Sequence, residues 1–198
     1  MNLTQITIKP KQPDEPFVNG ENELGFNITD FWKWNLSDLI GNTNRGVLAE
    51  FIVKQALNIK SKTRLEWDAF DLETDDGIKI EIKSSAYIQV WKQNEFSKIT
   101  FGIAPTKTLL GDNTYSTDFK RQADVYVFCL LHHKEQASLN PMDLKQWTFY
   151  VLKTETLNKK SETQKTITLS AIEALEHKKC NYNELKNAFN SFTKNLNT

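Results

Sequence analysis

Residues 71–83 read DLETDDGIKIEIK, and this stretch indicates how the chain folds. Over residues 78–83, apolar and charged side chains alternate strictly, which is typical of a β-strand with one buried face. The isoleucines would face the core, while Lys79, Glu81 and Lys83 would face the other way. The Asp-Gly pair just before this strand is a strong signal for a tight turn, so the stretch predicts a β-hairpin.

The predicted hairpin brings carboxylates together. Asp71 would lie next to Glu81 across the turn, although Asp68 could also reach this position because the register of a hairpin cannot be fixed from sequence. Two converging carboxylates repel each other unless a cation lies between them, and their oxygens suit a hard divalent cation. Lys83 would lie on the same face as Glu81, where an ammonium group can orient a water and stabilise charge on a phosphate.

An Asp followed by Glu-x-Lys on a core strand is thus a set of groups suited to metal-assisted phosphodiester hydrolysis. The alternative is a solvated strand face with a loose ion pair, and Lys79 on the same face supports that alternative.

Helices and further strands surround the hairpin. A helix with a wide apolar face is predicted after a cap at one of residues 42–44, and a shorter aromatic helix is predicted at residues 30–40. This order of elements predicts an α/β fold with a mixed central β-sheet flanked by helices. The other predicted elements are strands at residues 65–72, 97–103, 125–131, 147–152 and 166–169, and helices that begin at caps Ser170 and Asn183.

The chain divides into three predicted parts. Residues 1–25 are a polar N-terminal lead-in, residues 26–157 form the α/β core, and residues 158–198 form a small C-terminal helical appendage packed on the core. The polar run 158–163 is the boundary before this appendage.

The order of these residues resembles the PD-(D/E)xK nuclease superfamily, whose fold is called restriction-endonuclease-like. Asp71, Glu81-Ile82-Lys83 and the preceding helix with Glu50 carry the resemblance, between about residues 44 and 93. It implies a nuclease core that hydrolyses DNA with Mg²⁺ or Mn²⁺. By this resemblance, Asp71, Glu81, the Ile82 carbonyl and Glu50 would hold the metal, and Lys83 would act on the water and the phosphate.

Glu50 also has a structural reading, because it could form an i,i+4 ion pair with Lys54 on the helix surface.

Several side chains near this motif are candidates for binding the substrate. Asn44 and Arg45 would lie at a helix start, where a phosphate can bind, although a plain helix cap fits equally well. The small side chains of Ser84 and Ser85 would let a nucleic-acid backbone approach. Further along, the chain offers an amide and an ammonium group for base edges or phosphates, at Gln89 and Lys92.

The composition limits the function classes. The chain has 198 residues with 25 basic and 25 acidic side chains, so bulk positive charge does not bind it to nucleic acid. The N-terminus has no apolar signal region, the sequence has no membrane span, and Cys129 and Cys180 form no disulfide framework, so a cytoplasmic location is expected.

The sequence therefore predicts a DNA nuclease that contacts no membrane and could form a homodimer or bind a protein partner. One alternative is an inactive nuclease fold that binds DNA or a protein. Another is an interaction subunit that docks a partner on an apolar stripe of its C-terminal helices, although such a stripe can equally pack on the core; its residues are Leu185, Ala188, Phe189 and Phe192.

Overall fold

The computed structural model describes residues 6–60, 63–64, 69–107, 114–160 and 162–194. Its helices are α1 (Ile28–Leu36), α2 (Asn42–Leu57), α3 (Thr154–Lys160), α4 (Leu169–Glu173) and α5 (Tyr182–Thr193). Its strands are β1 (Pro16–Asn19), β2 (Asn22–Asn27), β3 (Leu72–Glu73), β4 (Lys79–Ala86), β5 (Thr100–Gly102), β6 (Val125–Leu131), β7 (Trp147–Lys153), β8 (Thr166–Thr168) and β9 (Lys178–Cys180). No helix in these ranges is long and apolar enough to cross a lipid bilayer.

Five strands form the central sheet, in the order β3-β4-β6-β7-β9. β4 and β6 run parallel, whereas the other neighbouring strands run antiparallel, so the sheet is mixed as the sequence predicts. Every residue of β6 is buried, which explains why its sequence is continuously apolar instead of alternating. Asp124 joins the starts of the two parallel strands, because its N–H donates to the Lys79 carbonyl and its carboxylate accepts from the Lys79 N–H, both at 2.9 Å.

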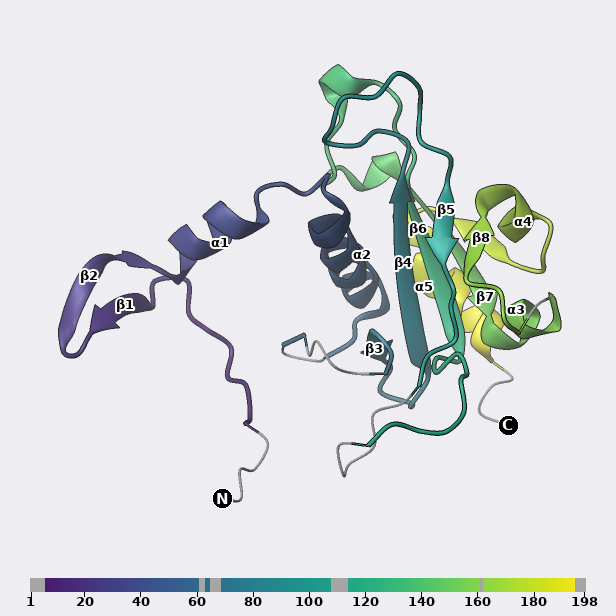
Figure 1. The fold of residues 1–198 in the computed structure, drawn as a ribbon, viewed down its shortest axis with the longest axis horizontal. Helices are drawn as coiled ribbons and strands as arrows, with labels where there is room; N and C mark the ends of the chain where they lie inside the picture. Colours follow the sequence, from purple (N-terminus) through teal and green to yellow (C-terminus); the bar gives the residue numbers. More distant parts are fainter. Residues whose placement is uncertain (1–5, 61–62, 65–68, 108–113, 161, 195–198) are drawn as a thin grey trace.

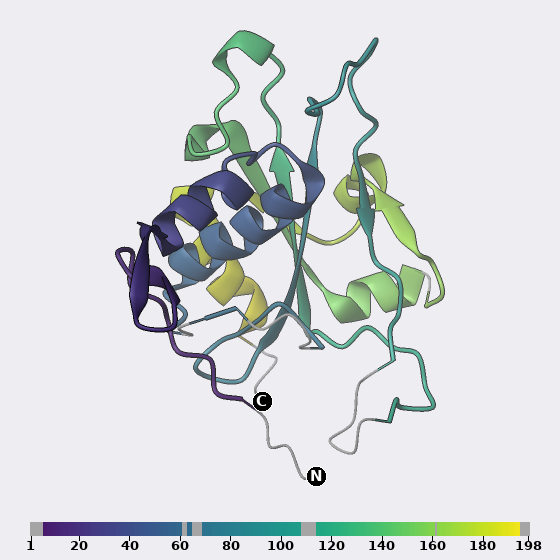
Figure 2. The same ribbon diagram turned by 60° about the vertical axis from the view of Figure 1, so that its left-hand side comes forward.

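Separate layers cover the two faces of this sheet (Figures 1 and 2). On one face, Ile80 and Ile82 of β4 pack with α2 and α5 in the larger apolar core. On the other face, Tyr126 and Phe128 of β6 pack with the two-stranded β5–β8 sheet, α3 and α4. Because side chains alternate along a strand, the charged residues of β4 point to this second face.

The first structured elements of the chain lie outside the central sheet. β1 and β2 form a hairpin that leads into α1, and Figure 1 shows these elements projecting away from the sheet. We call residues 13–38 the N-terminal arm; none of its residues is buried. The lead-in predicted over residues 1–25 therefore contains most of a hairpin that the sequence did not reveal.

Several helices begin or end at other residues than predicted. An Asn27–Asp30 capping box starts α1, which ends at Leu36 before the predicted end. Gly41, not one of residues 42–44, is the N-cap of α2. The caps of α4 and α5 are Thr168 and Asn181, each two residues before the predicted cap.

The C-terminal part is more closely joined to the core than the predicted helical appendage. β9, which was not predicted, adds the last strand to the central sheet beside β7. α3 was also not predicted, and it extends to Lys160, into the polar run that was expected to be a loop. The predicted apolar stripe on α5 packs into the larger core, with Leu185, Phe189 and Phe192 buried, so it is no docking face.

Of the predicted strand at residues 65–72, residues 65–68 lie outside the described part of the chain; among the described residues 69–72, only Leu72 belongs to a strand.

Candidate active site

The β3–β4 hairpin fixes Asp71 beside the middle of β4. Leu72 pairs with Ile80, and the Asp71 N–H donates to the Ile80 carbonyl at 3.0 Å. The Asp71 carboxylate then accepts the N–H of Ile82 at 2.6 Å. Two hydrogen bonds from one residue thus hold this carboxylate at the Glu81-Ile82-Lys83 segment, as the sequence predicts for Asp71. The rival candidate Asp68 lies outside the described residues.

Glu81 and Lys83 lie side by side on the face of β4 that points away from α2. The Lys83 ammonium group is 2.5 Å from a Glu81 carboxylate oxygen, and the two side chains are 33% and 19% exposed. The two side chains are thus half-buried and form an ion pair that remains partly accessible to water.

The charges at this site perturb one another. Burial, followed by the negative charge of Glu81, raises the pKa of Asp71 from its usual value near 3.8 to about 7. Burial alone would lower the pKa of Lys83, but the nearby carboxylates, with Glu81 first, outweigh it, and the pKa is raised. Lys83 is therefore protonated at neutral pH, whereas Asp71 is close to its titration midpoint.

Glu50, on α2, influences the same cluster through its charge. Its negative charge also acts on Asp71 and Lys83, which places the three carboxylates and the lysine in one electrostatic group. The Glu50 side chain, 12% exposed, forms a two-pronged ion pair with Arg64, with N–O distances of 2.5 and 3.0 Å. The partner of Glu50 is thus a residue beyond the helix and not Lys54, which the sequence suggested as an alternative.

The donors present at this site fit a hard divalent cation in their chemistry, because they are carboxylate oxygens that repel one another when charged. Within the described ranges, no three His, Cys, Asp or Glu side chains are already arranged around a common metal position. Two of the carboxylates are paired with cations of the protein: Lys83 contacts an oxygen of Glu81, and Arg64 donates to both oxygens of Glu50. A metal would have to compete with these cations for the carboxylates.

Asn44 acts within the protein. Its side-chain amide donates to the carbonyls of Asn35 and Asp38, both at 3.0 Å, and so joins the start of α2 to the end of α1. These two hydrogen bonds hold the Asn44 side chain in position, and Gly41 is the helix cap instead. Binding of a phosphate by Asn44 stays a prediction.

Arg45 and Gln89 are buried partners of each other. The Arg45 side chain, 3% exposed, donates to the Ile40 carbonyl at 2.8 Å, to Asn42 at 2.6 Å and to Gln89 at 3.2 Å. The Gln89 amide in turn donates to the Ala86 carbonyl at 2.8 Å. These hydrogen bonds connect α2 to the end of β4. The sequence does not predict this structural role of Arg45 and Gln89.

The other predicted substrate contacts differ in accessibility. Ser84 is half-buried and Ser85 is buried. Lys92 is exposed in the loop after β4, at a cavity of about 700 Å³ that the exposed aromatic rings of Trp91 and Phe96 also line. The substrate contacts of these residues stay predictions.

Two neighbours of the site, Tyr126 and Arg64, are not predicted from the sequence. Tyr126 of β6 lies directly opposite Glu81 in the parallel register, and burial, with the charge of Glu81 second, raises its pKa. Arg64 pairs with Glu50. A parallel register across 45 residues leaves no local sequence signal, whereas Arg64 could have been noticed as one of three arginines in the chain.

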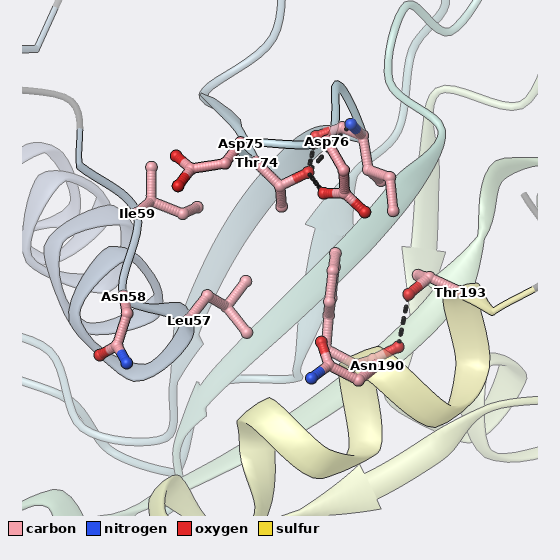
Figure 3. Close-up of a pocket in the computed structure, with 10 residues that line it drawn as sticks. Leu57, Asn58, Ile59, Thr74, Asp75, Asp76, Asn190 and Thr193 are labelled. Carbon is pink, nitrogen blue, oxygen red and sulfur yellow. Dashed lines mark hydrogen bonds between the residues drawn. The ribbon is translucent and has the colours of Figure 1, made fainter. Parts of the chain in front are cut away.

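A second, smaller cavity of about 160 Å³ lies at the turn of the β3–β4 hairpin, between the end of α2 and α5 (Figure 3). Asp75 and Asp76 line it, as residues of the predicted turn. The Thr74 hydroxyl donates a hydrogen bond to the Asp76 carboxylate at 2.5 Å, and the Asp75 carboxylate forms an ion pair with Lys60 at 3.0 Å. The acidic groups at this cavity are thus engaged with partners within the protein.

One comparison with known proteins matches most of the chain. The family model of bacteriophage T4 endonuclease IV matches residues 28–171, a range that includes α1, α2, the β3–β4 hairpin, β6 and β7. No curated protein sequence matches the chain. The matched range contains every predicted site residue.

Proposed function

The chain belongs to the bacteriophage T4 endonuclease IV family and is a nuclease that acts on DNA; we propose that it cleaves phosphodiester bonds at the Asp71–Glu81–Lys83 cluster. The observation that carries this proposal is the 2.6 Å hydrogen bond from the Ile82 N–H to Asp71. It holds a buried carboxylate against the segment that presents both Glu81 and Lys83. A like-charged neighbour makes ionisation of a carboxyl group less favourable. Such pairs are more typical of functional sites than of purely structural positions.

The proposed cofactor is Mg²⁺ or Mn²⁺. Asp71 and Glu81 would hold it, with the Ile82 carbonyl and Glu50 as further ligands. When bound, a divalent cation lowers the pKa of a coordinated water and neutralises charge on a phosphate. The raised pKa of Asp71, caused first by burial and then by the charge of Glu81, is consistent with this assignment, because a bound cation would stabilise the ionised carboxylates.

Lys83 would act as a hydrogen-bond donor. Its raised pKa keeps the ammonium group protonated, so it is suited to orient the attacking water and to stabilise negative charge on the phosphate, and unsuited to accept a proton. To reach the substrate, Lys83 would exchange its Glu81 contact for a phosphate oxygen.

The assignment to the PD-(D/E)xK superfamily is part of the same proposal. Its support is the order of the groups along the fold: a helix carboxylate, a hairpin aspartate, and a Glu-x-Lys on the next strand of a mixed sheet.

Cleavage assays of site variants test the proposal. Glu81→Ala and Lys83→Ala should each lower Mg²⁺-dependent cleavage of plasmid and single-stranded DNA by at least about 100-fold. Lys79→Ala is the matched control, because it removes a lysine from the same face of the same strand, outside the carboxylate cluster. Wild-type cleavage in both site variants, with circular dichroism spectra unchanged, would contradict the proposed site.

A metal titration separates this proposal from an inactive nuclease fold that only binds DNA or a protein. Isothermal calorimetry with Mg²⁺ and Mn²⁺ should show binding to the wild-type chain that is weakened in Glu81→Ala. No heat of binding at millimolar metal would favour the inactive fold.

A further inference from the structure

The N-terminal arm presents an apolar surface that nothing in the described part of its own chain covers. Seven large apolar side chains of the arm are 37–82% exposed, which are Phe17, Val18, Leu24, Phe26, Phe31, Trp34 and Leu36. At roughly 200 Å² for each full side chain, their exposed area sums to about 700 Å². This sum lies above the area of the largest patch on a typical monomer, and it is most of the roughly 800 Å² that each partner contributes to a standard interface.

The arm is nevertheless well formed. The rings of Phe17 and Phe26 lie 5.0 Å apart across the hairpin, and those of Phe31 and Trp34 lie 6.3 Å apart on α1. Thr29 bonds the Pro13 carbonyl at 2.5 Å and so closes the arm on itself. An ordered element with an exposed apolar face is typical of a surface that binds a partner.

The junction between α1 and α2 keeps the arm away from its own sheet. The Asp38 carboxylate accepts the N–H groups of Ile40 and Gly41, at 3.1 and 2.9 Å. From α2, Asn44 bonds the carbonyls of Asn35 and Asp38, both at 3.0 Å. These bonds hold the short connection in a conformation that projects the arm away from its own core (Figure 1).

The charge of the arm is complementary to that of the rest of the chain. Residues 13–38 carry six acidic side chains and one lysine, a net charge of −5. The remaining residues carry 24 basic and 19 acidic side chains, a net charge of +5, since the whole chain is neutral. An acidic, apolar arm held away from its own basic body fits the basic body of a second copy.

We propose that two copies of this chain exchange their N-terminal arms, so that each arm packs on the body of the other copy. The exchange is symmetric and doubles the buried area, which gives a closed dimer. The inference is independent of the nuclease chemistry, because no residue of the proposed catalytic cluster belongs to the arm.

Light scattering coupled to size exclusion tests this inference with the full chain. The wild type should run at twice the chain mass of 22.9 kDa at micromolar concentration. Phe31→Ser combined with Trp34→Ser should raise the dimer dissociation constant at least about 30-fold, measured by sedimentation. Asn35→Ser is the control, because it changes an exposed polar side chain of the same helix without removing apolar surface, and it should leave the dimer unchanged.

A charge variant distinguishes packing of the arm on the partner's body from packing of two arms on each other. Glu21→Lys combined with Glu23→Lys should weaken a dimer held by arm-to-body contacts, and should strengthen or spare one held by two acidic arms. Any of three results would overturn the proposal. The wild type could stay monomeric, the aromatic double variant could dimerise normally, or the charge variant could dimerise as well as wild type.

Discussion

Asp71 lowers the stability of the fold at the pH where the enzyme would work. Burial and the charge of Glu81 raise its pKa to about 7 in the folded chain, against about 3.9 in an unfolded one. A carboxyl whose pKa is raised by folding contributes stability below the unfolded value, and this contribution is lost as the pH rises through about 7. Ionised Asp71 thus favours the unfolded state at alkaline pH, by at most about 4 kcal/mol.

We therefore expect Asp71→Asn to stabilise the protein at pH 8. The amide oxygen can still accept the Ile82 N–H, but it carries no charge to desolvate. The melting temperature should rise by several degrees at pH 8, at roughly 2–4 °C per kcal/mol, and should change little at pH 4. Calorimetric melting curves across this pH range measure the difference.

Asp75→Asn is the control for this pH series, because it makes the same change at an exposed position of the same hairpin, 62% exposed in its ion pair with Lys60. Equal shifts in both variants would show that Asp71 carries no special desolvation cost.

The sequence predicts the central part of this site and misses its surroundings. Asp71, Glu81 and Lys83 could be found because a hairpin and strict alternation place them by local rules alone. The ion pair of Glu50 with Arg64, and the position of Tyr126 opposite Glu81, depend on segments far apart in the chain. Sequence patterns do not specify such registers, which the tertiary packing sets.

Two helices begin with the same capping device in different surroundings. Asn27 and Asp30 form a capping box at α1, and Asn181 and Glu184 form one at α5. α5 packs into the larger core, whereas α1 has no buried residue. The same substitution at the two caps should therefore have different consequences for the fold.

Asn181→Ala should lower the free energy of global unfolding by about 1 kcal/mol, because α5 unfolds together with the sheet. Asn27→Ala should leave the main transition unchanged, since α1 can fray without disturbing the core. Urea denaturation followed by circular dichroism, at the same dilute chain concentration, measures both. A matching loss of stability at Asn27 would mean that the arm unfolds cooperatively with the body.

Elements with a clear hydrophobic period were predicted, and those without one were not. β4 alternates and β6 is continuously apolar, so both were found within a few residues of their true ends. β9 consists of Lys178, Lys179 and Cys180, with the lysines exposed at the sheet edge. Lysines suit an edge strand because they oppose further pairing, but they give no sign of a strand in the sequence.

The chain is neutral overall, but its charge is unevenly distributed: the N-terminal arm, residues 13–38, has a net charge of −5, and the remaining residues have a net charge of +5. We expect DNA affinity to come from the basic part, and to fall steeply with salt as phosphate contacts release counterions. Fluorescence anisotropy with the Glu81→Ala variant should show log affinity falling linearly with log salt between 50 and 200 mM, as is usual for such contacts. Affinity that does not change with salt would contradict an electrostatic interface.

The parallel pairing of β4 with β6 determines when the active site can form during synthesis. Lys79 and its partner Asp124 are 45 residues apart. At roughly 5–20 residues per second, the ribosome needs about 2–9 s to add the strand that buries one edge of β4 and places Tyr126 against Glu81. A nascent chain can therefore form the β3–β4 hairpin, with Asp71 held at Ile82, seconds before β6 covers the other edge of β4 and Tyr126 comes to lie opposite Glu81.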